Sequence, residues 1–127
     1  MDWKELLIRR IKSFGYAGKG LYTLFRTQPN AWIHLTAVVV VSGAGWWLGI
    51  ERWEWIILVL CYTLVLMAEA FNTALEFLTD LVSPEVHPLA GKTKDVAAAG
   101  VLIAALGAVV VAAFIFGPPL RKWWLGY

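Results

Sequence analysis

Residues 96–116 have the sequence VAAAGVLIAALGAVVVAAFIF, a run of 21 residues without a charged side chain. A helix rises about 1.5 Å per residue, so this run would be about 30 Å long, the thickness of the hydrocarbon core of a bilayer. Backbone N–H and C=O groups find no water at that depth, and a helix satisfies them within one segment. We therefore predict a transmembrane helix over residues 94–116.

Two further apolar segments precede this one, over residues 31–50 and 53–82, the second with a cytoplasmic extension beyond its apolar part. Tryptophans cluster around the short connection between them, as expected at a membrane interface. The 127 residues are 60% hydrophobic and 16% charged, whereas a soluble domain carries about a quarter charged residues. The sequence thus predicts an all-α integral membrane protein with three transmembrane helices in a single domain, residues 1–127.

Residues 2–28 form a region of different character before the spans. Apolar side chains recur at helical spacing through residues 2–14, and basic side chains occupy the other side. Such an amphipathic helix fits a membrane surface, and a packed face of a small helical bundle is the alternative. Glycines at 15, 18 and 20 predict a looser segment after residue 14.

The basic residues predict the orientation. Residues 1–30 contain six Lys and Arg and the 81–95 connection contains two, against three on the opposite side. Because Lys and Arg are retained on the cytoplasmic side, we expect the N-terminus and the second connection in the cytoplasm. The net charge of +2, without a basic run that interleaves aromatics, predicts no nucleic-acid partner.

The second span carries a row of polar side chains beyond its apolar part. Four residues follow at spacings of three, four and four: Glu69, Asn72, Glu76 and Asp80. These spacings place them on one face of a helix, with Glu69 inside the inner leaflet and Asp80 in water. A carboxylate at the depth of Glu69 costs about 2.5 kcal/mol or more to insert, so either a structural partner or a function must retain it.

The connection after this helix adds an acid, an imidazole and two ammonium groups: Glu85, His87, Lys92 and Lys94. Thr93 is a candidate N-cap for the third span. Free N–H groups at a helix start attract anions, and Lys94 strengthens the attraction. Alone, the two lysines would be solvated anchors, but beside carboxylates they predict a site for metal-bound phosphates.

These groups fit phosphoryl transfer to a lipid hydroxyl. A base must lie within hydrogen-bond reach of the hydroxyl at the membrane, and carboxylates nearer to water can hold Mg²⁺, which needs few protein ligands. The row thus places a candidate base first and candidate metal ligands among the carboxylates nearer to water. P-loop and protein-kinase signatures are absent. The alternatives are a small transporter or channel subunit that uses Glu69, and a non-enzymatic assembly factor.

The sequence also resembles the small bacterial diacylglycerol kinase and undecaprenol kinase family, over about residues 9–116. The motif EAFNTALE at 69–76 and the motif KDVAAA at 94–99 carry the resemblance. Asp80, Glu85 and His87 between them, and Gly15-Tyr16 and Lys19-Gly20 near the start, agree with it. The segment 80–90, and Asn30 with Ile33-His34, look more like the undecaprenol kinase branch.

The resemblance implies an ATP-dependent kinase of lipid metabolism and phospholipid biosynthesis that needs Mg²⁺. Undecaprenol would be the substrate, with diacylglycerol as the alternative. It also implies a homotrimer of three-helix subunits, each with an N-terminal surface helix, with active sites shared between neighbours. The protein would be multi-pass in the bacterial cytoplasmic membrane, with its active site on the cytoplasmic side.

The resemblance implies a role for each matching residue. Glu69 would be the general base, and Glu76 with Gln28 would bind the metal. The expected ATP contacts are Arg9, Tyr16, Gln28, Glu76, Glu85, Val86, His87, Lys94 and Asp95. The residues expected beside the lipid are Glu69, Asn72, Asn30, His34 and the small Ala98. Gln28 stands where the family commonly has an acid, so its carbonyl oxygen would bring no charge to the metal.

Overall fold

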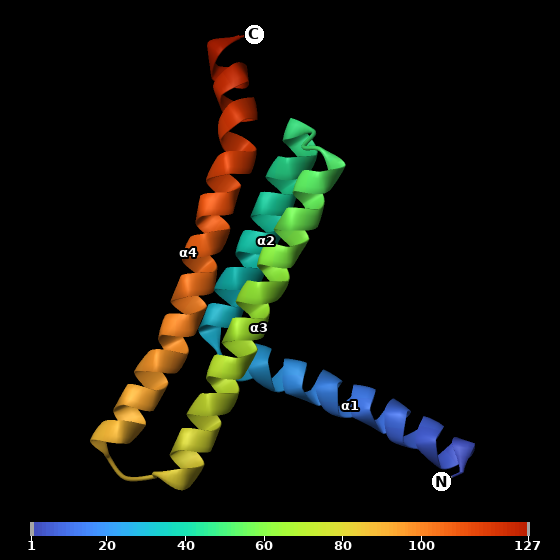
Figure 1. The fold of residues 1–127 in the computed structure, drawn as a ribbon, viewed down its shortest axis with the longest axis vertical. Coiled ribbons are helices and arrows are strands. Elements are labelled where there is room, and N and C mark those ends of the chain that lie inside the picture. Colours follow the sequence, from blue (N-terminus) through green and yellow to red (C-terminus); the bar gives the residue numbers. More distant parts are fainter. Residues whose placement is uncertain (1, 127) are drawn as a thin grey trace.

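The computed structural model describes residues 2–126, which form four helices: α1 (Trp3–Thr27), α2 (Pro29–Leu48), α3 (Arg52–Val82) and α4 (Pro88–Leu125). Three of them, α2, α3 and α4, are long and apolar enough to cross a membrane. They run along one another, whereas α1 leaves the bundle at a steep angle (Figure 1). The predicted all-α membrane fold with three spanning helices is confirmed.

The three spanning helices differ in length. The 20 residues of α2 correspond to about 30 Å, one hydrocarbon core, while α3 and α4 reach about 46 and 57 Å. At the end where α1 joins α2, the last turns of α3 and the first turns of α4 project past the start of α2 (Figure 1). The α3–α4 connection therefore lies beyond the level at which α1 leaves the bundle.

Helix α1 continues without a break through Gly15, Gly18 and Gly20, so the predicted loosening after residue 14 is wrong. A glycine lowers helix stability by about 1 kcal/mol relative to alanine but does not forbid the helical backbone. Asp2 caps the start of α1 by accepting a hydrogen bond from the Lys4 N–H. Along its 25 residues only Leu24 is buried, so nearly the whole surface of α1 is open.

The connection between α2 and α3 is tight. Gly49 ends α2 with a left-handed backbone, φ 64°, which favours glycine. Four residues earlier, Gly45 is buried where α3 approaches α2. A Cβ atom on Gly45 would lie 2.9 Å from Ile50 Cδ1 and 3.0 Å from Trp55 Cη2. Close contact between these two helices therefore depends on glycine at this position.

Helix α4 begins at Pro88, with His87 as its N-cap, and the His87 Nδ1 accepts a hydrogen bond from the Leu89 N–H at 3.1 Å. The prediction that Thr93 caps this helix is wrong, because Thr93 lies inside α4 and its hydroxyl donates to the Leu89 carbonyl at 2.9 Å. Proline is favoured at the first helical position, where an N–H would have no partner. The unpaired N–H groups of this helix start thus lie nearer to Pro88 than to Lys94.

At its other end α4 continues through Pro118 and Pro119 to Leu125. There Trp123 meets Trp47 of α2 edge to face, with ring centroids 5.7 Å apart. This geometry is favourable for aromatic pairs. The far end of α4 is thereby joined to the end of α2.

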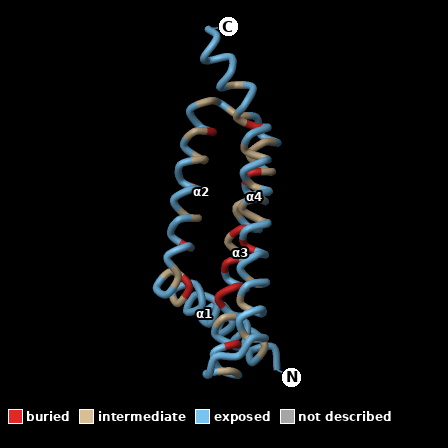
Figure 2. Tube along the Cα trace, turned by 90° about the vertical axis from the view of Figure 1, so that its left-hand side faces the viewer, coloured by how far each residue is buried: buried red, intermediate tan, exposed pale blue. Residues whose placement is uncertain are grey.

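The buried residues lie mostly along α3 rather than in a central apolar core (Figure 2). Four of them are polar: Glu69, Asn72, Thr73 and Thr79. Helix α3 packs mainly against α4, and most large apolar side chains of the three spans face outward. An apolar surface of this extent suits a lipid environment or contacts between chains. The described chain thus has an apolar exterior, and its four buried polar residues lie along α3 inside it.

Candidate active site

Glu69 is the most deeply buried charged residue of the described chain, with 1% of its surface exposed. Neither of its carboxylate oxygens has a hydrogen-bond partner within residues 2–126. It lines an open pocket of about 290 Å³ between α2, α3 and α4, together with Asn30, His34, Asn72 and Ala98. All five residues expected beside the lipid thus line a single pocket.

His34 of α2 is the nearest basic side chain to this carboxylate. Its Nε2 atom is 3.9 Å from Glu69 Oε2, and its side chain is 18% exposed. The distance allows an ion pair when the imidazole is protonated, but it is too long for a direct hydrogen bond. An acid without a hydrogen-bond partner thus lies beside an imidazole that is less deeply buried than the acid.

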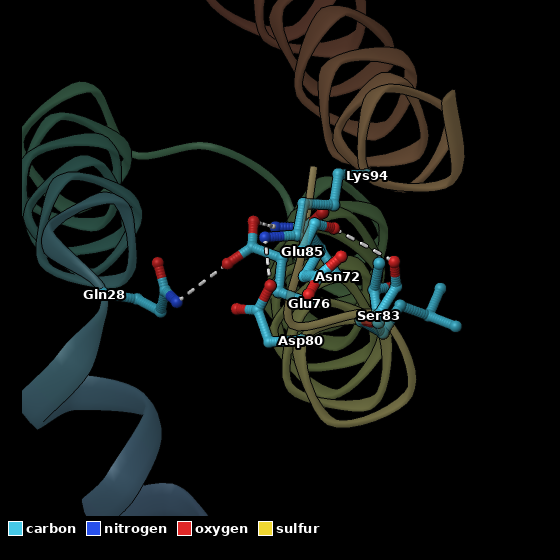
Figure 3. Close-up of polar contacts among 9 residues, drawn as sticks. Gln28, Asn72, Glu76, Asp80, Ser83, Glu85 and Lys94 are labelled. Atoms are coloured by element: carbon cyan, nitrogen blue, oxygen red, sulfur yellow. Dashed lines mark hydrogen bonds and ion pairs between the residues drawn. The ribbon is translucent and has the colours of Figure 1, made fainter. Parts of the chain in front are cut away.

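Glu76, two turns further along α3, is held by two amide groups. Asn72 Nδ2 donates to Glu76 Oε1 at 3.0 Å, and Gln28 Nε2 donates to Glu76 Oε2 at 3.2 Å. Gln28 lies between α1 and α2 and points toward α3 (Figure 3). The Glu76 carboxylate therefore has one amide on each oxygen and lies at the level of the α1–α2 junction.

Asp80 of α3 forms an ion pair with Lys94 of α4, and this pair lies beside Glu76 (Figure 3). Both side chains are partly open to solvent, 63% and 40% exposed. Exposed ion pairs contribute about 0–1 kcal/mol to stability. The main effect of this pair is therefore on the position of the Lys94 side chain. It holds the Lys94 ammonium group on the side of α4 that faces α3.

Four of the remaining predicted ATP contacts are exposed at the end of the bundle where α3 connects to α4. Glu85, Val86 and His87 lie in the exposed α3–α4 connection, where the Ser83 hydroxyl donates to the Glu85 carbonyl at 3.1 Å. Asp95 follows Lys94 on α4 and is exposed. Within one chain, this group lies next to the Asp80–Lys94 pair along the sequence and on the same end of the bundle (Figure 1).

Arg9 and Tyr16 are not brought to this end. Both are exposed on α1, which runs away from the α3–α4 connection (Figure 1). Among residues 2–126, neither side chain forms a hydrogen bond or ion pair with α3 or α4. The structure of one chain therefore does not assemble these two residues with the other predicted ATP contacts.

The donor set around Glu76 can be compared with what Mg²⁺ requires. Within the described residues, no group of three His, Cys, Asp or Glu side chains converges to hold a metal. Mg²⁺ usually takes one or two protein carboxylates and completes its shell with water and phosphate oxygens. The Glu76 carboxylate, which the Gln28 Nε2 donor orients, fits an ion that arrives with a phosphate rather than one held by protein alone.

Two contacts of this site were not predicted from the sequence. The Asp80–Lys94 pair joins two helices across their connection, and the spacing within either helix says nothing of the other. Thr73 is buried, and its hydroxyl donates a hydrogen bond to the Glu69 carbonyl at 2.9 Å, a contact that the sequence analysis missed. Its position four residues after Glu69 was the available signal, because a helical Thr often donates to the carbonyl one turn back.

Known proteins are similar to this chain over most of its length. A family model described as prokaryotic diacylglycerol kinase matches residues 15–116. The chain is 34% identical over 119 residues to the undecaprenol kinase of Bacillus subtilis, which covers 94% of this chain and 97% of that protein. It is 42% identical over 109 residues to a diacylglycerol kinase of Synechocystis, covering 85% of this chain and 62% of that protein. The diacylglycerol kinase of Escherichia coli is 32% identical over 102 residues, 80% of this chain and 84% of that protein.

The matched region includes every residue that lines the Glu69 pocket or contacts Glu76. These matches give no support to the alternatives of a transporter subunit or an assembly factor. They show that the protein is a multi-pass membrane lipid kinase, a transferase with an alcohol group as acceptor, and that it belongs to the prokaryotic diacylglycerol kinase family.

Proposed function

We propose that this protein transfers the γ-phosphoryl group of ATP to the hydroxyl group of undecaprenol at the cytoplasmic face of a bacterial membrane, with Mg²⁺ as cofactor. Glu69 is the general base, Glu76 holds the metal, and Gln28 supports Glu76 through the hydrogen bond between them. The proposal depends most on one observation: a buried Glu69 carboxylate with both oxygens unpaired, lining an open pocket on a spanning helix.

A buried acid without a hydrogen-bond partner lowers the stability of the protein, so its presence points to a function. In the proposed reaction, Glu69 accepts the proton of the lipid hydroxyl while the hydroxyl oxygen attacks the γ-phosphorus, and ADP leaves with the electrons of the broken P–O bond. The pocket is open between the helices, and the small side chain of Ala98 forms part of its wall. A lipid alcohol can therefore approach Glu69 from within the bilayer.

The water side of the site supports the nucleotide assignment. Glu76 lies seven residues after Glu69 on α3, which corresponds to about 10 Å along the helix. Lys94 lies beyond Glu76 and is directed toward α3 by Asp80. A carboxylate that can hold Mg²⁺ and an ammonium group suit the phosphates of ATP, while Glu85, Val86, His87 and Asp95 are open to solvent nearby.

The character of α1 supports the proposed membrane arrangement. Its apolar and basic side chains are nearly all exposed. It ends at Thr27, with Gln28 as its C-cap, and leaves the bundle at a steep angle (Figure 1). A helix of this kind on the cytoplasmic surface would put Glu76 at the boundary and Glu69 just inside it. Three chains arranged as a homotrimer would cover exposed apolar faces and could bring Arg9 and Tyr16 of one subunit to the site of another.

Two observations support undecaprenol rather than diacylglycerol as the proposed substrate. The similarity to the Bacillus undecaprenol kinase extends over nearly the full length of both proteins, 94% and 97%. Beyond Asn30, His34, Glu69 and Asn72, the pocket lining is apolar, with Val101, Leu102 and Ala105 along α4. An apolar wall suits a hydrocarbon alcohol, while the two ester groups of diacylglycerol would also need hydrogen-bond donors.

The test uses purified protein in mixed micelles with Mg²⁺ and γ-labelled ATP. We expect label in undecaprenyl phosphate, with kcat/KM for undecaprenol above that for diacylglycerol. A higher kcat/KM for diacylglycerol would contradict the substrate assignment and leave the kinase assignment intact. Label in neither lipid, from protein that is monodisperse in detergent, would contradict the proposed function.

A further inference from the structure

The burial of Glu69 raises a question about where its proton goes. If Glu69 is the base of the proposed reaction, each turnover leaves one proton on a carboxyl group that is 1% exposed. That proton must reach water before the next lipid can react. A base enclosed by helices and lipid therefore needs a neighbour that can accept the proton and pass it on.

His34 has the geometry for this task. Among residues 2–126, it is the one basic side chain within ion-pair distance of Glu69, with Nε2 3.9 Å from Oε2. Both side chains line the same pocket, and the imidazole is 18% exposed where Glu69 is 1% exposed. Histidine can accept a proton on one ring nitrogen and release one from the other near neutral pH.

We propose that His34 removes the proton from Glu69 after phosphoryl transfer and releases it toward the cytoplasmic surface. This inference depends on the proposed function. The Glu69 O–H bond breaks and an N–H bond forms at His34 Nε2, which makes the imidazole a cation. The proton on the other nitrogen then passes to water, and the neutral imidazole and the Glu69 carboxylate are restored.

Within residues 2–126, α3 and α4 add no titratable side chain to the pocket besides Glu69 itself. Helix α4 contributes Ala98, Val101 and Leu102 to the pocket, and none of these can titrate. On α3 the nearby charged group is Glu76, whose oxygens already accept hydrogen bonds from Asn72 and Gln28. The gap of 3.9 Å is longer than a hydrogen bond, so a bridging water or a small turn of the imidazole completes the path.

The experiment compares wild type, His34→Gln and the control Thr36→Val in the micelle assay. The amide introduced by His34→Gln would keep a polar group near the Nε2 position but could not carry a proton. Thr36 is exposed on α2, and its hydroxyl bonds only to its own helix, at the Trp32 carbonyl. We expect His34→Gln to lower kcat by on the order of ten- to a hundredfold, to leave both KM values within about twofold, and to raise the solvent deuterium isotope effect on kcat. Thr36→Val should match the wild type.

A second variant separates proton transfer from shape. Removing the imidazole in His34→Ala leaves space for a free base, so added imidazole should restore kcat in proportion to its concentration. Wild-type kcat in His34→Gln would overturn the inference, and so would a slow His34→Ala that imidazole does not restore. In both cases an active wild type would leave the proposed function standing. A wild type that phosphorylates no lipid would contradict both.

Discussion

The Gln28 amide and the Glu76 carboxylate are joined by a hydrogen bond of 3.2 Å across 48 residues of sequence. This contact connects the α1–α2 junction to α3. Asn72 occupies the other Glu76 oxygen at 3.0 Å. The two amides thus fix the direction of the one carboxylate that we assign to the metal.

Loss of the Gln28 amide should weaken metal binding. In Gln28→Ala, the Glu76 carboxylate loses one of its two supports, and we expect the Mg²⁺ concentration for half-maximal activity to rise about tenfold, as for other groups that orient metal ligands. In Gln28→Glu, a second carboxylate replaces the amide and should lower that concentration. Titration of activity with Mg²⁺ at saturating lipid measures both, and equal requirements in all three proteins would rule out this role for Gln28.

Glu76 itself has a separate prediction. Glu76→Gln keeps the size of the side chain but removes the charge that attracts Mg²⁺, so the Mg²⁺ requirement should rise by at least as much as in Gln28→Ala. The measurement is the same metal titration, with size-exclusion chromatography to check that the variant assembles. An unchanged requirement would mean that Glu76 does not bind the metal.

The Asp80–Lys94 pair predicts an effect on nucleotide binding without a large effect on stability. Because both groups are partly exposed, Asp80→Asn should change stability by less than about 1 kcal/mol. Lys94 loses its fixed direction, so the KM for ATP should rise several-fold. Glu5→Gln, which removes an exposed acid from α1, is the control for net charge. A KM for ATP that rises equally in both variants would point to long-range charge instead of the pair.

Gly45 predicts a packing effect that does not involve the site. A Cβ atom there would meet Ile50 and Trp55 at 2.9 and 3.0 Å, whereas one on Gly43 would meet nothing within 4 Å. Gly45→Ala should destabilise the protein by about 1–3 kcal/mol, and Gly43→Ala should be neutral or stabilising by up to about 1 kcal/mol. Thermal unfolding in detergent measures the difference, and the same Tm for both variants would contradict the close α2–α3 contact.

The fold was predictable because length and hydropathy constrain a membrane helix strongly. Residues 96–116 are long enough to cross the hydrocarbon core, and helix is the conformation that satisfies the backbone there. Helical periodicity likewise predicted the shared face of Asn72 and Glu76, which the hydrogen bond between them now shows. Both inferences use contacts within a single helix.

The contacts between helices could not be predicted from spacing. Gln28 meets Glu76, and His34 meets Glu69, only because α2 runs antiparallel to α3 with a particular offset. That offset is set by the tight connection at Gly49 and by the close approach at Gly45. A periodic pattern in one segment contains no information about its register against another.

The local errors came from weak signals. Three glycines lowered the helix propensity of residues 15–20, but propensity is a small free energy that the rest of a long helix can offset. Thr93 is a suitable N-cap, but His87 is another, because its imidazole accepts the Leu89 N–H and Pro88 follows it at the first helical position. These two candidate N-caps, six residues apart, could not be ranked without the structure.

The most direct test of the central assignment is the rate of lipid phosphorylation by Glu69→Gln. This change keeps the shape of the side chain in its pocket and removes its ability to accept a proton. We expect kcat to fall by on the order of a hundred- to ten-thousandfold, while size-exclusion chromatography and Mg²⁺-dependent ATP binding stay as in the wild type. Phosphorylation of the lipid at the wild-type rate by Glu69→Gln would contradict the account.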